Sequence, residues 1–171
     1  MPEGHEGAMV HLEAPPEALG RLWDGSLALE AVSKYVARLG ELTRIRAVVA
    51  IGSRASGDWK PWSDIDIIIV CEQDVRHALA SIPGFGIIDP RLYTPDSLIE
   101  GIAKCEVELV EAFERGLVLY DDGIWSRARA FYEHVKATLG LEEYGPGWRI
   151  RRRVPWRELA ELGRSYLVAG T

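Results

Sequence analysis

The sequence predicts an α/β fold of the α+β kind, in which a small sheet is flanked by helices and followed by a helical C-terminal extension. Apolar, β-branched runs at 47–51 and 65–70 are bounded by turn residues, as buried strands are. Apolar residues at helical spacing recur over 26–40, 94–115 and 125–139. The 171 residues, 47% of them hydrophobic, are enough for one buried core.

Composition argues against two classes of protein. A net charge of −6 and a pI near 5.3 argue against bulk electrostatic binding of nucleic acid. No run of 18 apolar residues appears, and the N-terminus is acidic and lacks an apolar signal core, so we expect a cytoplasmic protein without a membrane partner. The histidines are scattered singly, and we expect Cys71 and Cys105 to be free buried thiols.

The chain before the first strand divides into an arm and a helix. Residues 1–25 form an N-terminal arm, and the Gly, Glu and Pro content of residues 1–16 predicts a mobile or loosely docked segment. A helix is predicted over 26–40, with Ser26 as the cap and Gly40 as the end.

The first strand ends in a turn that suits phosphate. Val48, Val49 and Ile51 lie in an apolar run that stops at Gly52. The residues after Ser53 can open a short helix, whose backbone N–H groups favour anions.

Two carboxylates begin the second strand. Asp64 and Asp66 are two residues apart, so they point to one face, about 6.6 Å apart along the strand. Like charges on one face destabilise a strand unless they are compensated, and a hard cation with oxygen ligands is the usual compensation. The pair therefore predicts a metal site for Mg²⁺, or Mn²⁺ in its place, beside the phosphate turn.

These residues carry a resemblance. Gly52-Ser53-Arg54-Ala55-Ser56-Gly57-Asp58, followed by Ser63-Asp64-Ile65-Asp66 and an apolar strand, resembles the signature of the minimal nucleotidyltransferase family within the DNA polymerase beta-like superfamily. The resemblance spans about residues 26–123, which we take as the nucleotidyltransferase domain with its small mixed sheet. Residues 124–171 would be a helical extension packed on the same domain.

The resemblance implies a third carboxylate on the next strand, and Asp89 matches its position. In the family this residue ligates the metal and acts as general base, so the catalytic and metal-binding residues would be Asp64, Asp66 and Asp89. Asp96 and Glu100 are the alternatives for Asp89. The sequence departs from the pattern at Pro90, which predicts an edge strand or a bulge because proline cannot donate to a sheet ladder.

The remaining candidates surround this motif. The predicted nucleotide-binding residues are Gly52, Ser53, Arg54, Lys60 and Ser63. Trp59 and Trp62 either stack on a base or pin the loop to the core. Arg91 shares the strand face of Asp89 and would touch the acceptor or offset the carboxylates.

The second half of the chain is predicted to be mainly helical. A helix opens at Thr94-Pro95-Asp96 and runs to about Arg115, followed by a short strand at 117–121. The extension has a helix over 125–139, a Gly-Pro-Gly break and a last helix near 156–167. Its arginine- and tryptophan-rich segment, 148–157, is either a solvated linker paired with acids or a surface for phosphate, bases or an RNA acceptor.

Three functions follow from the resemblance and the residues. The first is an Mg²⁺-dependent, ATP-type nucleotidyltransferase that transfers a nucleoside monophosphate from a nucleoside triphosphate by a two-metal mechanism. Its acceptor would be a hydroxyl of a small molecule, an RNA end or a protein. The second is an antitoxin that acts on or binds a helical toxin, and the third is a nucleotide-binding module without turnover.

Overall fold

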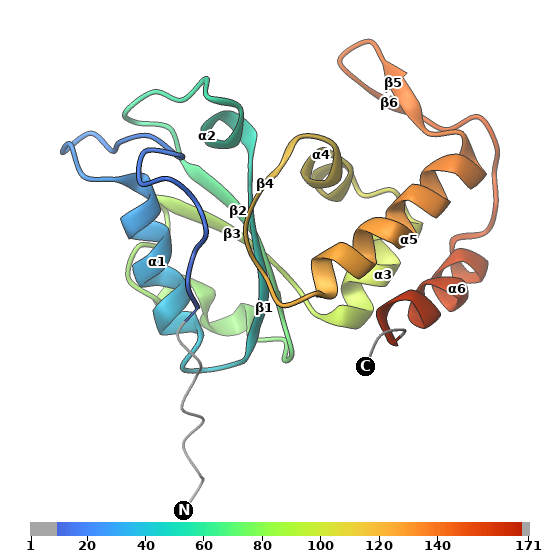
Figure 1. Cartoon of the computed structure of the whole chain (residues 1–171), viewed down its shortest axis with the longest axis horizontal. Helices are drawn as coiled ribbons and strands as arrows, with labels where there is room; N and C mark the ends of the chain where they lie inside the picture. The colour runs from blue at the N-terminus through green and yellow to red at the C-terminus, as the bar shows by residue number, and fades with distance from the viewer. Residues whose placement is uncertain (1–9, 169–171) are drawn as a thin grey trace, which may run out of the picture.

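The computed structural model describes residues 10–168, and it contains a four-stranded sheet with helices on both faces (Figure 1). In the order β3-β2-β1-β4, β1 is antiparallel to both of its neighbours, whereas β2 and β3 are parallel. This mixed sheet, with its flanking helices and C-terminal helix, confirms the predicted fold class. The strands are β1 (Ile45–Ile51), β2 (Ile65–Cys71), β3 (Ile88–Tyr93) and β4 (Leu117–Asp121).

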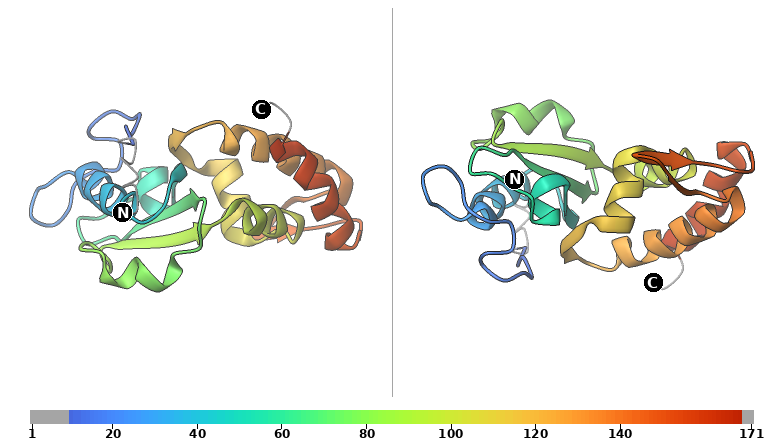
Figure 2. Two further views of the ribbon diagram at one scale, coloured as in Figure 1. Left: turned by 90° about the horizontal axis from the view of Figure 1, so that it is seen from below. Right: turned by 90° about the horizontal axis from the view of Figure 1, so that it is seen from above.

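The two central strands are buried on both faces, which explains their nearly continuous apolar sequences. Val48 and Ile67 point into one hydrophobic cluster, and Val49 and Ile68 point into the other. Figure 2 shows the sheet between the two groups of helices. One face is covered by α1 (Ala28–Leu39) and the 3-10 helix η1 (Arg76–Ser81). The other is covered by α3 (Pro95–Ala103), α4 (Val107–Arg115) and α5 (Ile124–Leu139).

The segment before α1 is docked where the structure describes it. The N–H of Glu13 donates to the carbonyl of Leu119 at 2.7 Å, and Leu19 is fully buried. The expectation of a mobile or loosely docked segment also covers residues 1–9, which lie outside the described residues. The predicted cap was wrong, because α1 begins after Leu27 and the Ser26 hydroxyl bonds Asp24 instead.

The single helix predicted to reach Arg115 is in fact two helices. Thr94 caps α3 as predicted, accepting from the N–H of Ser97, but the helix ends at Ala103. Cys105 then has a φ of 53°, a left-handed conformation that interrupts a helix, and α4 follows. The break lets α3 pack on α6 (Trp156–Val168) while α4 packs on β1.

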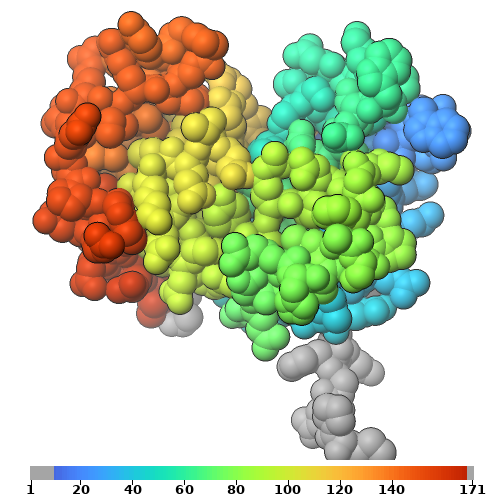
Figure 3. Space-filling model, turned by 180° about the vertical axis from the view of Figure 1, so that it is seen from behind, coloured from blue at the N-terminus to red at the C-terminus, as the bar shows by residue number. Residues whose placement is uncertain are grey.

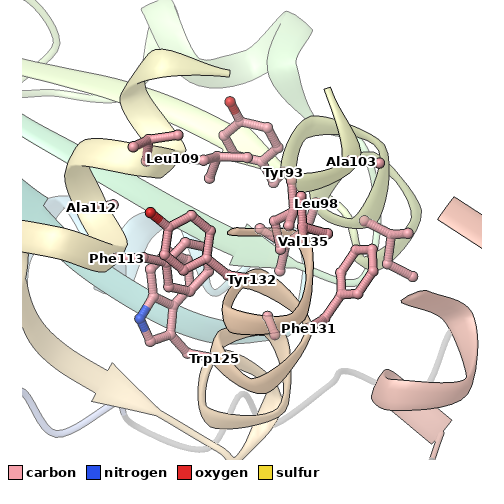
Figure 4. Close-up of a cluster of buried hydrophobic side chains, with 14 of the residues drawn as sticks. Tyr93, Leu98, Ala103, Leu109, Ala112, Phe113, Trp125, Phe131, Tyr132 and Val135 are labelled. Atoms are coloured by element: carbon pink, nitrogen blue, oxygen red, sulfur yellow. The ribbon is translucent and has the colours of Figure 1, made fainter. Parts of the chain in front are cut away.

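The core on the α3–α5 side is centred on three stacked aromatic rings (Figure 4). The ring of Phe113 lies 4.2 Å from that of Trp125 and 4.8 Å from that of Tyr132, measured between centroids. Stacked rings of this kind add to the stability from area burial. These contacts fix the C-terminal half of α4 against α5.

The C-terminal part contains the two predicted helices and a short hairpin between them. The predicted Gly-Pro-Gly break is the turn of this hairpin, β5 (Glu142–Tyr144) and β6 (Gly147–Arg149). In the arginine-rich segment, Arg149 and Arg151 bind Glu142, and Arg152 donates to carbonyls at the end of α5.

Two sequence expectations about burial and membranes can be compared with the structure. Both cysteines are free, as predicted, but only Cys71 is buried and Cys105 is half-buried. Over residues 10–168, no helix has both the length and the apolar character needed to cross a bilayer.

Candidate active site

Asp66 and Asp89 lie side by side at the same end of two parallel strands. Each is the second residue of its strand, and the two are register partners in the β2–β3 ladder. Partners in a ladder point to the same face of the sheet, here the face that α4 covers. Pro90 does not disturb this pairing, because β3 is an edge strand and its register with β2 is continuous.

The environment of Asp66 disfavours its charge. Its side chain is 29% exposed, against 49% for Asp89. Burial raises the pKa of Asp66, and the hydrogen bond to Asp89 and the charge of Asp89 raise it further, whereas Arg91 lowers it. The raised pKa of Asp66 thus reflects partial burial first and the second carboxyl group next.

Gly52 lies directly against this pair. Its φ is +72°, and a Cβ placed on it would be 2.8 Å from Oδ2 of Asp66. Glycine is therefore needed both for the backbone conformation and for the close approach of the carboxylate. The turn predicted to hold phosphate and the strand predicted to hold metal are in contact.

Asp64 is placed differently from the other two acids. It is exposed and lies one residue before β2 begins. Within the part of the chain that the structure describes, no group of three or more His, Cys, Asp or Glu residues is arranged to hold a metal ion. The structure thus brings together two of the three predicted carboxylates, and of the alternatives Asp96 and Glu100, both exposed on α3, neither pairs with Asp66.

Arg91 bridges the acid pair to α4. Its Nη1 lies 3.4 Å from Oδ1 of Asp66 and 3.3 Å from Oδ2 of Asp89, so it offsets the carboxylates. Its Nε lies 2.6 Å from Oε2 of Glu108 in the first turn of α4. Sequence reasoning missed Glu108, because the contact depends on where the helix break places α4. Glu108 also has a raised pKa, caused chiefly by burial.

Arg54 does not reach this site, so its predicted role in binding the triphosphate is not supported by its position. Its side chain is fully buried, and its three nitrogens donate to backbone carbonyls at 2.9–3.4 Å. The guanidinium also lies 5.4 Å from the centre of the Trp59 ring. Arg54 therefore holds the loop after α2 (Gly52–Ser56) to the N-terminal segment. The accepting carbonyls are those of Leu19, Arg21, Lys60, Pro61 and Ser63.

The other predicted nucleotide-binding residues lie on or beside this loop. The Ser53 hydroxyl and the Lys60 ammonium have no hydrogen bond or ion pair to any residue in the range 10–168, whereas the Ser63 hydroxyl accepts from the N–H of Lys60. Trp59 packs on Arg54, as a loop-pinning residue does, and Trp62 is 77% exposed.

A surface hollow and a cavity lie near the acid pair. Figure 3 shows a hollow at the upper edge of the molecule, between the teal segment after β1 and the yellow segment of α4. Asp66 belongs to this region, since it contacts Gly52 on one side and is joined through Arg91 to Glu108 of α4 on the other. A cavity of about 390 Å³ follows the outer edge of β3 and is lined by Arg91 and Glu108, among others.

The donor set suits a divalent ion. Asp66 and Asp89 offer hard oxygen ligands, and Mg²⁺ is commonly held by one or two carboxylates together with substrate phosphates and water. Burial and the neighbouring Asp89 raise the pKa of Asp66, and a bound cation would favour the charged form of both carboxylates. The two carboxylates therefore fit such an ion as a pair, whereas Asp64 does not join them here.

Comparison with known proteins identifies one family and one distant structure. The sequence model of the nucleotidyltransferase domain family matches residues 29–136. A solved structure described as the crystal structure of a toxin-antitoxin with AMP-PNP is similar at 18% sequence identity and a TM-score of 0.46, over 67% of this chain and 94% of that chain. No curated protein matches the chain.

Proposed function

The chain belongs to the nucleotidyltransferase domain family, and we propose that it transfers a nucleoside monophosphate from a nucleoside triphosphate to a hydroxyl acceptor. The observation that supports this proposal best is the pairing of Asp66 with Asp89 beside the Gly52 turn. Two carboxylates next to a glycine turn combine a place for a cation with a place for phosphate. We infer that the donor binds between α2 and α4.

Asp66 and Asp89 would hold a divalent ion, Mg²⁺ or Mn²⁺, with Asp64 as the third candidate ligand. When bound, the ion would supply positive charge to the triphosphate and to the transferring phosphoryl group. The Gly52–Ser53 turn would contact the β- and γ-phosphates through backbone N–H groups and the Ser53 hydroxyl, which has no partner among the described residues. Lys60, exposed in the same loop, would add a cation.

The chain's own residues would orient and deprotonate the acceptor. The acceptor oxygen would form a bond to the α-phosphorus while the bond from this phosphorus to the bridging oxygen breaks, and the electron pair leaves with pyrophosphate. Asp89 would take the hydroxyl proton, a role that its 49% exposed side chain suits because a substrate can reach it. The cavity along β3 is lined by Pro90 and Arg91, which follow Asp89 in the strand, and is the proposed approach for the acceptor.

The test compares three neutralised variants with one control. We expect Mg²⁺ with a nucleoside triphosphate at about 100 times its dissociation constant to raise the melting temperature by about 5–10 °C. Asp66→Asn and Asp89→Asn should lose this shift and should release no pyrophosphate, and Asp64→Asn should weaken both. Asp96→Asn, which changes an exposed acid in the first turn of α3, should behave as wild type. Unchanged pyrophosphate release in Asp66→Asn would refute the proposal.

A nucleotide-binding module without turnover is the second candidate, and one observation favours it. Asp64 stands apart from the pair, so the described residues hold two aligned carboxylates where two-metal catalysis would use three. This candidate predicts the same thermal shift without pyrophosphate release. A helical toxin partner remains a prediction from the family resemblance.

A further inference from the structure

We propose that the guanidinium of Arg91 serves as an internal counter-cation for the carboxylates of Asp66 and Asp89. A divalent ion that binds these carboxylates must displace the guanidinium, which Glu108 then retains. The inference rests on the proposed function, because it concerns the same carboxylates. It assigns Arg91 and Glu108 as positioning residues that set the affinity of the site for metal. Glu108 lies outside the signature motif, on α4.

The first observation is that Arg91 contacts its partners through two different nitrogens. Nη1 faces the oxygens of Asp66 and Asp89 at 3.4 and 3.3 Å, whereas Nε faces Glu108 at 2.6 Å. The guanidinium can therefore swing Nη1 away from the pair while Nε stays beside Glu108. The contacts of Arg91 with the two aspartates are thus longer than its contact with Glu108 of α4.

The second observation concerns Glu108. Its Oε2 is buried and has no hydrogen bond within residues 10–168, so the close contact with Arg91 is an ion pair with poor hydrogen-bond geometry. Its neighbour Glu106 is used differently, since it accepts from the Tyr93 hydroxyl at 2.7 Å. A buried acceptor that lacks a donor gains from a guanidinium that turns toward it.

A metal ion and Nη1 would compete for the carboxylate pair. Mg²⁺ binds oxygen at about 2.0–2.1 Å, and Nη1 already lies within 3.4 Å of one oxygen from each carboxylate. Two cations so close would repel each other strongly, because repulsion grows as the distance shortens. The charges that face Arg91 from β2, β3 and α4 are those of Asp66, Asp89 and Glu108, so Glu108 is the acid left to hold it once the ion binds.

The two residues should act in opposite directions on metal affinity. Arg91→Gln removes the competitor, so Mn²⁺ should bind about three to ten times more tightly. Glu108→Gln removes the charge that retains the displaced guanidinium, so Mn²⁺ should bind more weakly by a similar factor. Because Glu108 acts through Arg91, Glu108→Gln should have little further effect in the Arg91→Gln background.

Two control variants separate this competition from a general change of charge. Arg76→Gln and Glu100→Gln alter residues that line the same cavity along β3 but do not contact the acid pair. Arg76 pairs with Asp74, and Glu100 has no ion pair among the described residues. Each control should change Mn²⁺ affinity less than twofold.

The experiment is a Mn²⁺ titration of the full chain without nucleotide, in which electron paramagnetic resonance measures how much Mn²⁺ is bound. Melting temperatures in EDTA provide a second readout, in which Arg91→Gln should melt about 2–4 °C below wild type because the pair loses its cation. Equal affinities for Arg91→Gln and Arg76→Gln, or additive effects in the double variant, would overturn the inference. Asp66→Asn distinguishes a failure of this inference from a failure of the proposed function. This variant should not bind Mn²⁺. If it binds Mn²⁺ as tightly as wild type, the metal site of the proposed function is refuted as well.

Discussion

The Asp66 carboxylate packs against the backbone of Gly52, so closely that a Cβ at Gly52 would lie 2.8 Å from Oδ2. This contact joins the end of β1 to the start of β2 across the antiparallel ladder, in which Ile51 is the partner of Asp66. The turn and the carboxylate therefore form one structural unit, and a substitution at either residue should shift the position of the other.

Gly52→Ala should abolish metal and nucleotide binding and lower the free energy of unfolding. Part of the cost, about 1–2 kcal/mol, comes from the positive φ, and the clash with Asp66 adds to it. Gly57→Ala is the matched control, because its φ is +89° but nothing lies within 4 Å of the added Cβ. In nucleotide titrations followed by thermal shift, Gly57→Ala should bind nucleotide and Gly52→Ala should not. Urea unfolding measures the free energy of unfolding of both variants. Equal binding by the two variants would contradict the role given to the contact.

Arg54 should prove to be a stability residue whose loss also loosens the loop before Asp64. Arg54→Lys keeps the charge but cannot reach five carbonyls with one ammonium, so buried acceptors are left unpaired. We expect the free energy of unfolding to fall by about 3 kcal/mol or more in urea unfolding. Arg76→Lys, which changes an exposed arginine, should change it by less than about 0.5 kcal/mol. A similar small effect in Arg54→Lys would contradict this assignment.

Asp121 should make the stability of the chain depend on pH. Its carboxylate accepts from the N–H groups of Gly123, Trp125 and Ser126 at the start of α5. Burial acts in the opposite direction, but the hydrogen bonds from Ser126, Gly123 and Trp125 lower the pKa of Asp121 below the ordinary 3.8. A carboxyl with a lower pKa in the folded state stabilises fully above its unfolded pKa, and this contribution is lost as the pH falls through the folded pKa.

Asp121→Ala should therefore lower the free energy of unfolding by about 1–2 kcal/mol at pH 7, and by less as the pH falls below about 4. Asp121→Asn keeps an oxygen acceptor without the charge, so it should retain part of the stability and lose the pH dependence. Urea unfolding between pH 3 and pH 7 measures both. A constant difference between wild type and Asp121→Ala over this range would show that the charge is unimportant.

Local patterns were sufficient for much of the fold, whereas the partner of Asp66 was suggested by the family resemblance. The strands around Val49 and Ile68 are short, β-branched and bounded by turns, so their apolar runs identify them without knowledge of the partners. Asp89 was named from the resemblance, and of the edge strand or bulge that Pro90 predicted, the structure has the edge strand, because proline cannot donate to a sheet ladder.

Contacts between distant segments could not be predicted in the same way. Arg54 donates to the carbonyl of Leu19, 35 residues earlier. Every residue has a backbone carbonyl, so the sequence does not indicate which carbonyls accept from a buried arginine. The ion pair of Arg91 with Glu108 depends on the left-handed backbone of Cys105, which ends α3 and sets the position of α4. The apolar stripe from Leu98 to Phe113 continues across this break, so periodicity alone predicted one helix.

The C-terminal helix α6 should be an integral part of the folded domain. The substitution Gly163→Ala tests this, because the two alternatives predict opposite signs for its effect on the free energy of unfolding. A Cβ at Gly163 would lie 2.6 Å from the Phe131 ring and 2.8 Å from Ile99, so α6 approaches both α5 and α3 closely. Gly163→Ala should therefore lower the free energy of unfolding by about 1–3 kcal/mol through overpacking. In a detached helix the same change would be stabilising by about 1 kcal/mol, because alanine is the better helix former.

Ser165→Ala is the matched control for this prediction. Ser165 is exposed on the same helix and its hydroxyl bonds the carbonyl of Leu162, so its replacement should change stability by less than about 0.5 kcal/mol. Urea unfolding of the two variants decides between the alternatives. A loss confined to Gly163→Ala means that α6 unfolds together with the sheet, whereas a gain there would mean that residues beyond α5 form a separate unit that the proposed active site does not need.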